Sequence, residues 1–295
     1  MANLKEVRNR IASVKSTKQI TSAMKLVAAA KLRRAQDAII KMRPYASKLH
    51  EILSDLSATM EDSNEDVYSK QRDLNSVLLI VITSNRGLCG AFNVNVVKQA
   101  VKLLQTELAP LHADQKVSVV CYGKKGADLF KSKGIPVKEV NIDIFNQLDF
   151  AHAAPMAEGL MKDFENGSYD KIILIYNRFK NAAVQIMETE QFLPVEQKAE
   201  VVNQPHKRSP NYLFEPGKEE ILTELIPKTL KIQLYKALLD SYAAEHGARM
   251  TAMHQATENA TDLIKELNLT YNKARQAAIT KEILEIVSGA EALRG

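Results

Sequence analysis

Tryptophan is absent from this sequence of 295 residues, aromatic residues make up only 6%, and there are two cysteines. Cys89 and Cys121 cannot form a disulfide framework, and neither has the CxxC or histidine companions of a structural metal site. No apolar run approaches the roughly eighteen residues of a transmembrane helix, and the amino-terminal residues lack signal-peptide and transit-peptide character. We therefore expect the mature chain to begin here, to work in a cytoplasm-like compartment, and to bury both cysteines in its core.

Motifs for catalysis are missing as well. The turn at residues 84–93 contains neither G-x-G-x-x-G nor the P-loop pattern, and the six histidines form no H-E-x-x-H pair. No nucleophile elbow or paired-carboxylate pattern occurs. Gly87 and Gly90 could let backbone amides approach a phosphate, but they serve equally to pack the turn closely, and we interpret them as structural. Catalysis within this chain is therefore disfavoured, and we expect no bound cofactor or metal.

Positive charge is concentrated at one end of the chain. Residues 1–50 carry twelve Lys or Arg and two acidic residues, a net of +10, which leaves −5 for the remaining residues. Such a basic segment indicates contact with nucleic acid, anionic lipid or an acidic protein, although a solvated helix face explains the charges as simply. A basic-helix nucleic-acid-binding protein is thus one alternative, but residues 1–44 contain no aromatic side chain that could stack on bases.

The first segment predicts one long helix, over residues 1–60. Residues 2–58 contain no glycine, and their single proline is Pro44, where we expect a kink. Apolar residues recur at intervals of three and four, which is typical of a coiled-coil stripe. The predicted stripe contains Leu4, Val7, Ile11, Val14, Ile20, Met24 and Val27.

The middle segment, residues 75–195, alternates between short apolar runs and helical patterns. Such alternation predicts an open, largely parallel α/β sheet of Rossmann-like type, a fold that also suggests a nucleotide-using enzyme as a second alternative. We expect strands at 77–83, 117–122, 136–140, 172–176 and 184–189, and helices at 94–104, at 126–133 and from Pro155 to Asn166.

The last part of the chain returns to a helical pattern. Prolines punctuate residues 196–227, which we expect to form an extended linker with a short helix, and residues 228–289 predict a second long helix. Two rows repeat every seven residues there, namely Met253, Ala260, Leu267 and Ala274, and Ala256, Leu263, Thr270, Ala277 and Leu284. This helix can cover the first stripe only by running antiparallel to it. The sequence therefore predicts an antiparallel two-helix coiled coil with the α/β domain inserted between its helices.

Three blocks of residues resemble one family, the gamma subunit of F-type ATP synthases. They are residues 11–36, the turn at 83–93, which looks like the family's S-D-R-G-L-C-G, and the pair 245–253 and 271–290. The blocks lie in the middle and at both ends, so the resemblance covers essentially the whole chain.

Three positions depart from the family's pattern. Asn85 replaces the usual Asp, Gly247 stands where Ala is common, and Pro155 intrudes in the middle domain. The dithiol insertion of the chloroplast type is absent, which favours a bacterial enzyme.

The resemblance implies a mechanical role in a larger complex. The coiled coil would stand in a ring of three alpha and three beta subunits, and the α/β body would lie against the epsilon subunit and the membrane ring of c subunits. Proton-driven rotation of the c ring would turn the rod, and the rod would change the beta subunits between conformations that bind ADP and phosphate, form ATP and release it. The chain itself would then be non-catalytic, bind no nucleic acid, and lie at the cytoplasmic face of the bacterial inner membrane.

The resemblance also implies which side chains of the shaft contact the ring. They are Lys18, Met24, Lys25, Arg33, Arg34, Arg275, Gln276 and Thr280. For Met24 an ordinary place in the helix seam is equally well supported, and for the four basic residues a solvated face is the alternative. Arg275 and Gln276 fall between the seam residues Ala274 and Ala277, which places them on the flank and favours outward contact.

Overall fold

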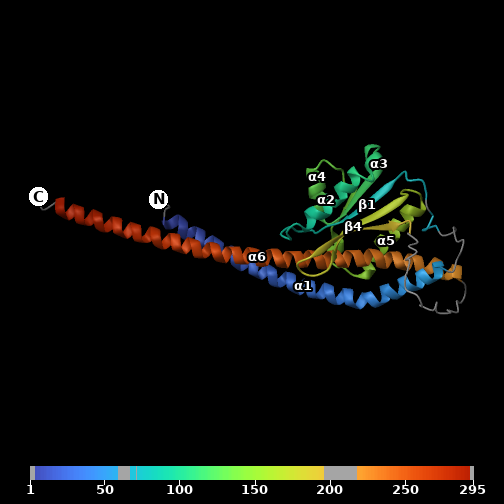
Figure 1. Cartoon of the computed structure of the whole chain (residues 1–295), viewed down its shortest axis with the longest axis horizontal. Helices are drawn as coiled ribbons and strands as arrows, with labels where there is room; N and C mark the ends of the chain where they lie inside the picture. Colours follow the sequence, from blue (N-terminus) through green and yellow to red (C-terminus); the bar gives the residue numbers. More distant parts are fainter. Residues whose placement is uncertain (1–3, 59–66, 71, 196–217, 293–295) are drawn as a thin grey trace, which may run out of the picture. The chain divides into compact units, whose positions relative to one another are not determined.

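The structure is a computed structural model that describes residues 4–58, 67–70, 72–195 and 218–292 (Figure 1). The chain forms two compact units, one from Met1–Ala29 with Arg249–Gly295 and the other from Ala30–Ala248. The elements are α1 (Leu4–Ala58), β1 (Val77–Ile82), α2 (Phe92–Gln105), α3 (Ala109–Ala113), β2 (Val117–Tyr122), α4 (Lys124–Ser132), β3 (Glu139–Asn141), the 3-10 helix η1 (Asp143–Phe145), α5 (Phe150–Glu165), β4 (Lys171–Phe179), β5 (Gln185–Leu193) and α6 (Lys218–Ala292).

In the first unit, the start of α1 and the end of α6 form an antiparallel pair. Arg8 donates a hydrogen bond of 2.8 Å to the Tyr271 hydroxyl, and the Oγ1 atoms of Thr21 and Thr257 lie 2.8 Å apart. Residue numbers therefore increase along α1 where they decrease along α6, and the predicted antiparallel pairing is confirmed. An apolar cluster seals this seam, made of Val7, Ile11 and Leu267 with Val14, Leu263 and Tyr271 packed against it.

The inner face of α1 follows a strict seven-residue repeat. Its inner positions are Val7, Ile11, Val14, Lys18, Thr21, Lys25, Ala28, Leu32, Ala35 and Ile39, all buried or half-buried. The predicted continuation of the stripe through Ile20 and Val27 is wrong, because these side chains are 57% and 58% exposed. The inner positions after Val14 are Lys18, Thr21 and Lys25, which are polar. The next apolar residues in the sequence, Ile20 and Val27, therefore lie on the outer face of the helix.

On α6 the first predicted row is confirmed, since Met253, Ala260 and Leu267 are buried and Ala274 is half-buried. The second row is wrong beyond Leu263. Thr270, Ala277 and Leu284 are exposed, and Tyr271 and Ala278 are half-buried instead. The second row of inner residues is instead Thr257, Ile264, Tyr271 and Ala278, which are all half-buried and again repeat every seven residues, one position after the predicted row.

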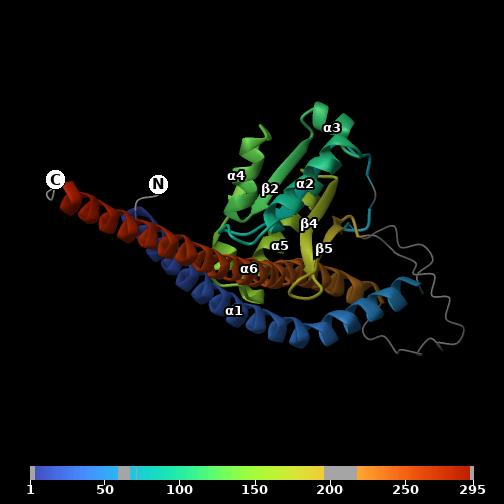
Figure 2. The same cartoon turned by 60° about the vertical axis from the view of Figure 1, so that its left-hand side comes forward.

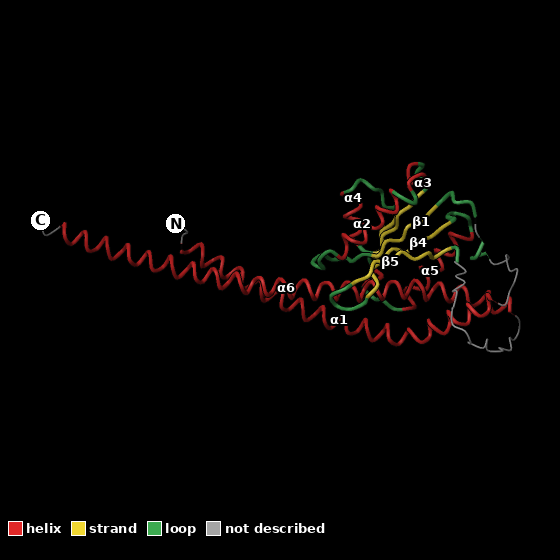
Figure 3. Tube along the Cα trace, viewed as in Figure 1, coloured by secondary structure: helices red, strands yellow, loops and turns green. Residues whose placement is uncertain are grey.

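The second unit contains a five-stranded sheet in the order β3-β2-β1-β4-β5 (Figure 3). β1 pairs in parallel with β2 and with β4, and β2 pairs in parallel with β3. Only β5 is antiparallel, along β4. The predicted open, largely parallel sheet is therefore confirmed.

Helices cover both faces of this sheet (Figure 2). On one face α2 and α4 pack against the strands, with a core that includes Leu79, Val81, Val97, Ala100 and Phe130. On the other face α5 and the beginning of α6 pack, and their buried residues include Leu160, Phe164, Leu230, Leu234 and Leu238. The first part of α6 is thus a layer of the α/β body. The predicted division of the chain into four segments stays a prediction.

Several predicted helix ends differ from the structure. α5 begins at Phe150 rather than at Pro155, because the Asp149 side chain caps the helix by accepting from the His152 amide at 2.9 Å. α6 begins at Lys218, so Pro227 lies inside it, next to the buried Ile226. Burial of apolar residues on both sides of Pro227 offsets the hydrogen bond that proline removes. The carboxyl end of α6 lies at Ala292, past the predicted end at Ser288 and Gly289.

Candidate functional site

Lys18, Met24 and Lys25 lie together along α1 in the first unit, and all three side chains are half-buried. Lys18 and Lys25 occupy inner positions of the seven-residue repeat, whereas Met24 lies beside the seam. No hydrogen bond or ion pair joins the Lys18 or Lys25 side chain to another residue of the described chain. These two ammonium groups therefore keep their donors available for a partner.

Arg33 and Arg34 lie further along α1, in the second unit, and both are exposed. Their neighbours Leu32 and Ala35 are buried at inner positions, so the repeat directs the two arginines outward. Neither guanidinium makes an ion pair with another described residue. Their exposure agrees both with partner contact and with a solvated face.

Arg275, Gln276 and Thr280 form a separate exposed group on α6. Half-buried Ala274 and Ala278 bracket Arg275 and Gln276, so both side chains lie on the flank of the seam. The Thr280 hydroxyl donates to the Gln276 carbonyl at 2.9 Å, which leaves its lone pairs for an outside donor.

The structure does not join this group to the lysines of α1. Thr257, which faces Thr21 between Lys18 and Lys25, lies roughly 28 Å before Gln276 at 1.5 Å per residue. The predicted contact residues of the first unit therefore form two patches at different levels of the coiled coil.

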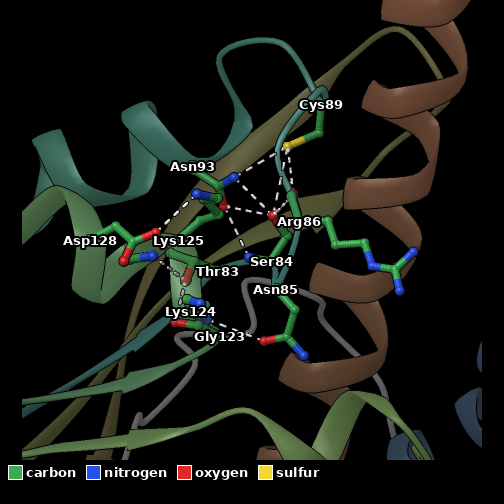
Figure 4. Close-up of polar contacts among 11 residues, drawn as sticks. Thr83, Ser84, Asn85, Arg86, Cys89, Asn93, Gly123, Lys124, Lys125 and Asp128 are labelled. Carbon is green, nitrogen blue, oxygen red and sulfur yellow. Dashed lines mark hydrogen bonds and ion pairs between the residues drawn. The ribbon is translucent and has the colours of Figure 1, made fainter.

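The β1–α2 turn is held by side chains of its own residues (Figure 4). The Ser84 amide donates to Asn93 Oδ1 at 2.9 Å, and Asn93 Nδ2 donates to Ser84 Oγ at 2.8 Å and to Cys89 Sγ at 3.2 Å. The Ser84 hydroxyl in turn donates to the Arg86 carbonyl at 2.7 Å. Ser84, Cys89 and Asn93 are all buried, so this network fixes the turn from inside.

Amides at the start of α4 are already used by the same turn. The Lys124 amide donates to Asn85 Oδ1 at 3.1 Å, the Lys125 amide to the Ser84 carbonyl at 3.0 Å, and the Gly126 amide to Thr83 Oγ1 at 2.9 Å. A phosphate at a helix start binds through such amides, and here they have protein acceptors. This arrangement disfavours the nucleotide-using enzyme.

Asn85 has a second role that explains its difference from the family's usual Asp. Its Nδ2 group donates to the Ile142 carbonyl at 2.7 Å while its Oδ1 accepts from Lys124. A carboxylate can accept but cannot donate, so only the amide makes both bonds. The side chain thereby ties the β1–α2 turn to the segment between β3 and η1.

The sheet order places a crevice between the carboxyl ends of β1 and β4, where open α/β folds bind ligands. Protein groups occupy this point. Asn177, at the end of β4, donates to the Phe92 carbonyl at 3.2 Å. Next to it lies an apolar cluster that includes residues of α6, made of Cys89, Phe92 and Ala244 with Phe179 and Ala248. The usual ligand position of the fold is therefore filled by the turn and by α6.

Gly90 has φ +60°, a left-handed conformation that favours glycine. Leu88, with φ +64°, adopts a similar conformation and is 63% exposed. Gly87 has no positive φ, and a Cβ built there would meet nothing within 4 Å. The left-handed conformation explains why position 90 is glycine, whereas nothing in the described structure requires glycine at position 87.

Reactive cysteine and metal chemistry find little support in the described part of the chain. Burial raises the pKa of the Cys121 thiol to about 12, so the thiol stays protonated at neutral pH. Among the described residues, no group of three His, Cys, Asp or Glu side chains is placed to hold a metal ion.

Sequence reasoning missed the polar residues that fix the structure from inside. These are Thr21, Asn93, Asn177 and Thr257. The departure at Gly247 was noted, but not the close approach of the β4–β5 loop to its backbone. For Thr21 a signal existed, because it lies fourteen residues after Val7 and so continues that row of the repeat. For Asn177 and Gly247 no local pattern gives a signal.

Comparisons with known proteins agree along the whole chain. A family model described as ATP synthase matches residues 3–293. The ATP synthase gamma chain of Flavobacterium johnsoniae is 58% identical over 295 residues and covers 100% of both chains. The gamma chain of Cytophaga hutchinsonii is 54% identical over 293 residues, covering 99% of each, and that of Chlorobaculum parvum is 46% identical over 294 residues, covering 100% of each.

Solved structures also resemble this chain. A chain of the Tetrahymena thermophila mitochondrial ATP synthase, in a structure titled central stalk and c ring, has 28% identity and a TM-score of 0.57, covering 80% of this chain and 99% of that one. A chain of the Euglena gracilis mitochondrial ATP synthase rotor has 23% identity and a TM-score of 0.65, covering 94% and 98%. The second likeness shows the fold alone.

Proposed function

This chain belongs to the ATP synthase gamma chain family, and from that premise we propose how its residues do the work of a rotor. The gamma chain is the central-stalk rotor subunit of the F-type ATP synthase. It couples proton-driven rotation of the c ring to the conformational cycle of the beta subunits, which carry the catalytic sites. The chain is therefore a non-catalytic subunit of an enzyme complex, and the full-length family match is the observation that carries this conclusion.

A rotor acts by contacting different conformations of its neighbours with different free energies. Moving a two-state equilibrium from 1:99 to 99:1 takes about 5.5 kcal/mol of differential binding. Hydrogen bonds to charged groups contribute about 1.5–3 kcal/mol each, so roughly two to four such contacts, made in one orientation and lost in the next, are enough. The shaft needs only a few well-placed charged side chains on each face.

We propose that Lys18, Lys25, Arg33 and Arg34 are such side chains on α1, with Met24 as an apolar contact beside them. Three observations support this role: the net charge of +10 in residues 1–50, the absence of intramolecular partners for the two ammonium groups in the described chain, and the outward position of both arginines. Acidic segments of the surrounding subunits are the complementary surface.

On α6 we propose Arg275, Gln276 and Thr280 as a second contact patch. Arg275 and Gln276 offer donors, and Thr280 offers acceptor lone pairs because its proton is used within the helix. Their exposure on the flank of the seam means that they can be replaced without opening the coiled coil.

The complex that we propose around this chain has three alpha and three beta subunits, an epsilon subunit and a c ring, and lies at the cytoplasmic face of the bacterial inner membrane. The bacterial gamma chains among its relatives support this placement. Within the described residues, no helix is long and apolar enough to cross a membrane. Attachment to the membrane would then pass through the other subunits.

Reconstitution of a complex that lacks its gamma chain tests the proposal. The parent chain is expected to co-purify with three alpha and three beta subunits and to restore proton pumping driven by ATP hydrolysis. Arg275→Ala and Gln276→Ala are expected to weaken assembly or pumping while the chain still folds. Lys265→Ala is the control, because Lys265 is exposed on the same helix and pairs only with Asp262 at 2.9 Å among the described residues. Loss of folding in the Arg275 and Gln276 variants would count against a contact role.

A further inference from the structure

The middle of the coiled-coil seam is polar on α1, and on α6 it consists of small residues apart from Met253. Lys18, Thr21 and Lys25 occupy three successive inner positions of α1. The facing stretch of α6 contains the buried Met253 and Ala260 and the half-buried Ala256 and Thr257. Large apolar side chains normally set the axial register of two helices by fitting into matching holes, and small residues do this weakly. Apolar side chains therefore constrain the register less at this level than in the cluster of Val7, Ile11 and Leu267, so a polar contact here has more effect on it.

The hydroxyls of Thr21 and Thr257 meet across the seam, with their Oγ1 atoms 2.8 Å apart. Thr21 is only 8% exposed, and Thr257 is half-buried. Each hydroxyl also lies near a carbonyl of its own helix, at 3.1 Å from Lys18 for Thr21 and at 2.7 Å from Met253 for Thr257.

Three contacts are thus served by only two protons, because a hydroxyl donates one hydrogen bond. The shorter distance assigns the Thr257 proton to the Met253 carbonyl. The Thr21 proton then crosses the seam to Thr257. Replacing either hydroxyl removes the bond between the helices while the helices keep their backbone bonds.

We propose that Thr21 and Thr257 are positioning residues that pin the axial register of the shaft. A slip of one heptad moves one helix by about 10 Å and brings Thr21 opposite Met250 or Ile264. Neither side chain can accept or donate as Thr257 does, so both hydroxyls lose their cross-helix bond. The register in turn sets the distance along the shaft between the α1 contacts around Met24 and the α6 contacts around Gln276. This last step rests on the proposed rotor function.

Disulfide crosslinking between engineered cysteines on α1 and α6 measures the axial register directly in the assembled complex. Ile11 and Leu267 belong to one buried cluster, so Ile11→Cys with Leu267→Cys reports the native register. Ile11→Cys with Ala260→Cys, or with Ala274→Cys, reports a slip of one heptad in either direction. The native Cys89 and Cys121 are buried and belong to the other unit. In the parent chain we expect mild oxidation to crosslink the native pair and not the slipped pairs.

Valine replaces the threonine hydroxyl by a methyl group of similar size. In the chain with Thr21→Val and Thr257→Val, we expect the ratio of native to slipped crosslink to fall by about fivefold or more, the change that matches one lost hydrogen bond. We expect ATP-driven proton pumping per ATP hydrolysed to fall with it. Thr21→Ser and Thr257→Ser keep the hydroxyls and are expected to behave as the parent. If the double variant fails to assemble, the single valine variants carry the test.

Thr270→Val is the matched control, because Thr270 makes the same bond to its own helix, at 3.0 Å to Glu266, but is exposed. An unchanged crosslink pattern in the double valine variant refutes the proposal that Thr21 and Thr257 fix the axial register, whatever the pumping result. A changed pattern with full pumping refutes the link between register and coupling. If the parent chain itself fails to restore pumping, the proposed function is refuted. The crosslink result still decides whether Thr21 and Thr257 fix the axial register.

Discussion

Gly247 offers a sharp test of how α6 meets the α/β body. It lies inside α6, and a Cβ built there would stand 3.2 Å from the Ala182 Cα, 3.4 Å from the Ala182 carbonyl oxygen and 3.4 Å from Phe179 Cε2. Two of these neighbours are backbone atoms of the β4–β5 loop, which cannot rotate away. Glycine therefore stands here because the loop approaches the helix backbone, which explains the departure from the family's common Ala.

Two opposing effects set the magnitude for Gly247→Ala. Replacing glycine by alanine inside a helix stabilises a chain by about 1 kcal/mol, whereas forcing an extra methyl into a packed site costs about 1–3 kcal/mol. We expect the free energy of unfolding to stay level or to fall by up to about 2 kcal/mol. Gly247→Val should lose roughly 2 kcal/mol more, because its two further methyl groups meet the same backbone atoms.

The control is Gly159→Ala in α5, where an added Cβ meets nothing within 4 Å. There the helix effect acts alone, so we expect a gain of about 1 kcal/mol. The difference between the two Gly→Ala variants then isolates the contact with Ala182. If Gly247→Ala stabilises the chain as much as Gly159→Ala does, the close approach is wrong.

Thiol exposure is a suitable assay, since the chain has no tryptophan and both cysteines lie in one of its two compact units. Cys89 and Cys121 are both buried in the unit that contains Gly247. The temperature at which they become reactive reports the unfolding of that unit alone. At this chain length, a change of 1 kcal/mol corresponds to a shift of roughly 2 °C.

Three further predictions concern the body. Asn85→Ala loses the bonds to Lys124 and Ile142 and should cost about 1–2 kcal/mol in thermal unfolding, while Asn85→Asp, which keeps an acceptor at the start of α4, should cost less. Asn93→Leu leaves the Ser84 amide without its acceptor and should cost about 2–3 kcal/mol in urea unfolding; no change would mean that the turn is held otherwise. Because burial raises the Cys121 pKa from 9.0 to about 12, its contribution to stability is complete below pH 9 and is lost as the pH rises towards 12. Cys121→Val should therefore flatten the alkaline decline in stability, and an equally steep decline would contradict this.

The α/β body was predictable from sequence because its strands are buried on both faces. All residues of β1 are buried, so the continuous apolar run at 77–83 was enough to locate this strand in the sequence. Helix ends were less predictable, because Asp149 caps α5 ahead of Pro155, where the helix was predicted to begin. A proline marks the first helical position when the residue directly before it is the cap, whereas Asp149 caps this helix six residues before Pro155.

The seam of the shaft was predicted in part for a different reason. Hydrophobic periodicity identifies inner positions only while they are apolar, and on α1 it fails where Lys18, Thr21 and Lys25 face inward. On α6 the inner row begins with Thr257, so the apolar pattern favoured the neighbouring row of Ala256 and Leu263, which is exposed from Thr270 onward. The predicted contact residues Met24 and Gln276 came from family resemblance, and their role stays a prediction.

Packing at the carboxyl ends of β1 and β4 explains why the usual ligand position of the fold is occupied by protein groups in the body. In an open α/β sheet the carboxyl ends of β1 and β4 leave a crevice, and backbone amides around it are usually available to a phosphate. Here Ala244 of α6 packs with Cys89 and Phe92 beside that point, and Asn177 donates to the Phe92 carbonyl. A ligand would have to displace the apolar contact with α6 and the hydrogen bond from Asn177 in order to bind. The amides of Ser84 and of residues 124–126 already have protein acceptors, so groups that a phosphate could use hold the turn and the start of α4 together. In this chain the carboxyl end of the sheet is therefore used for packing and not for binding a nucleotide.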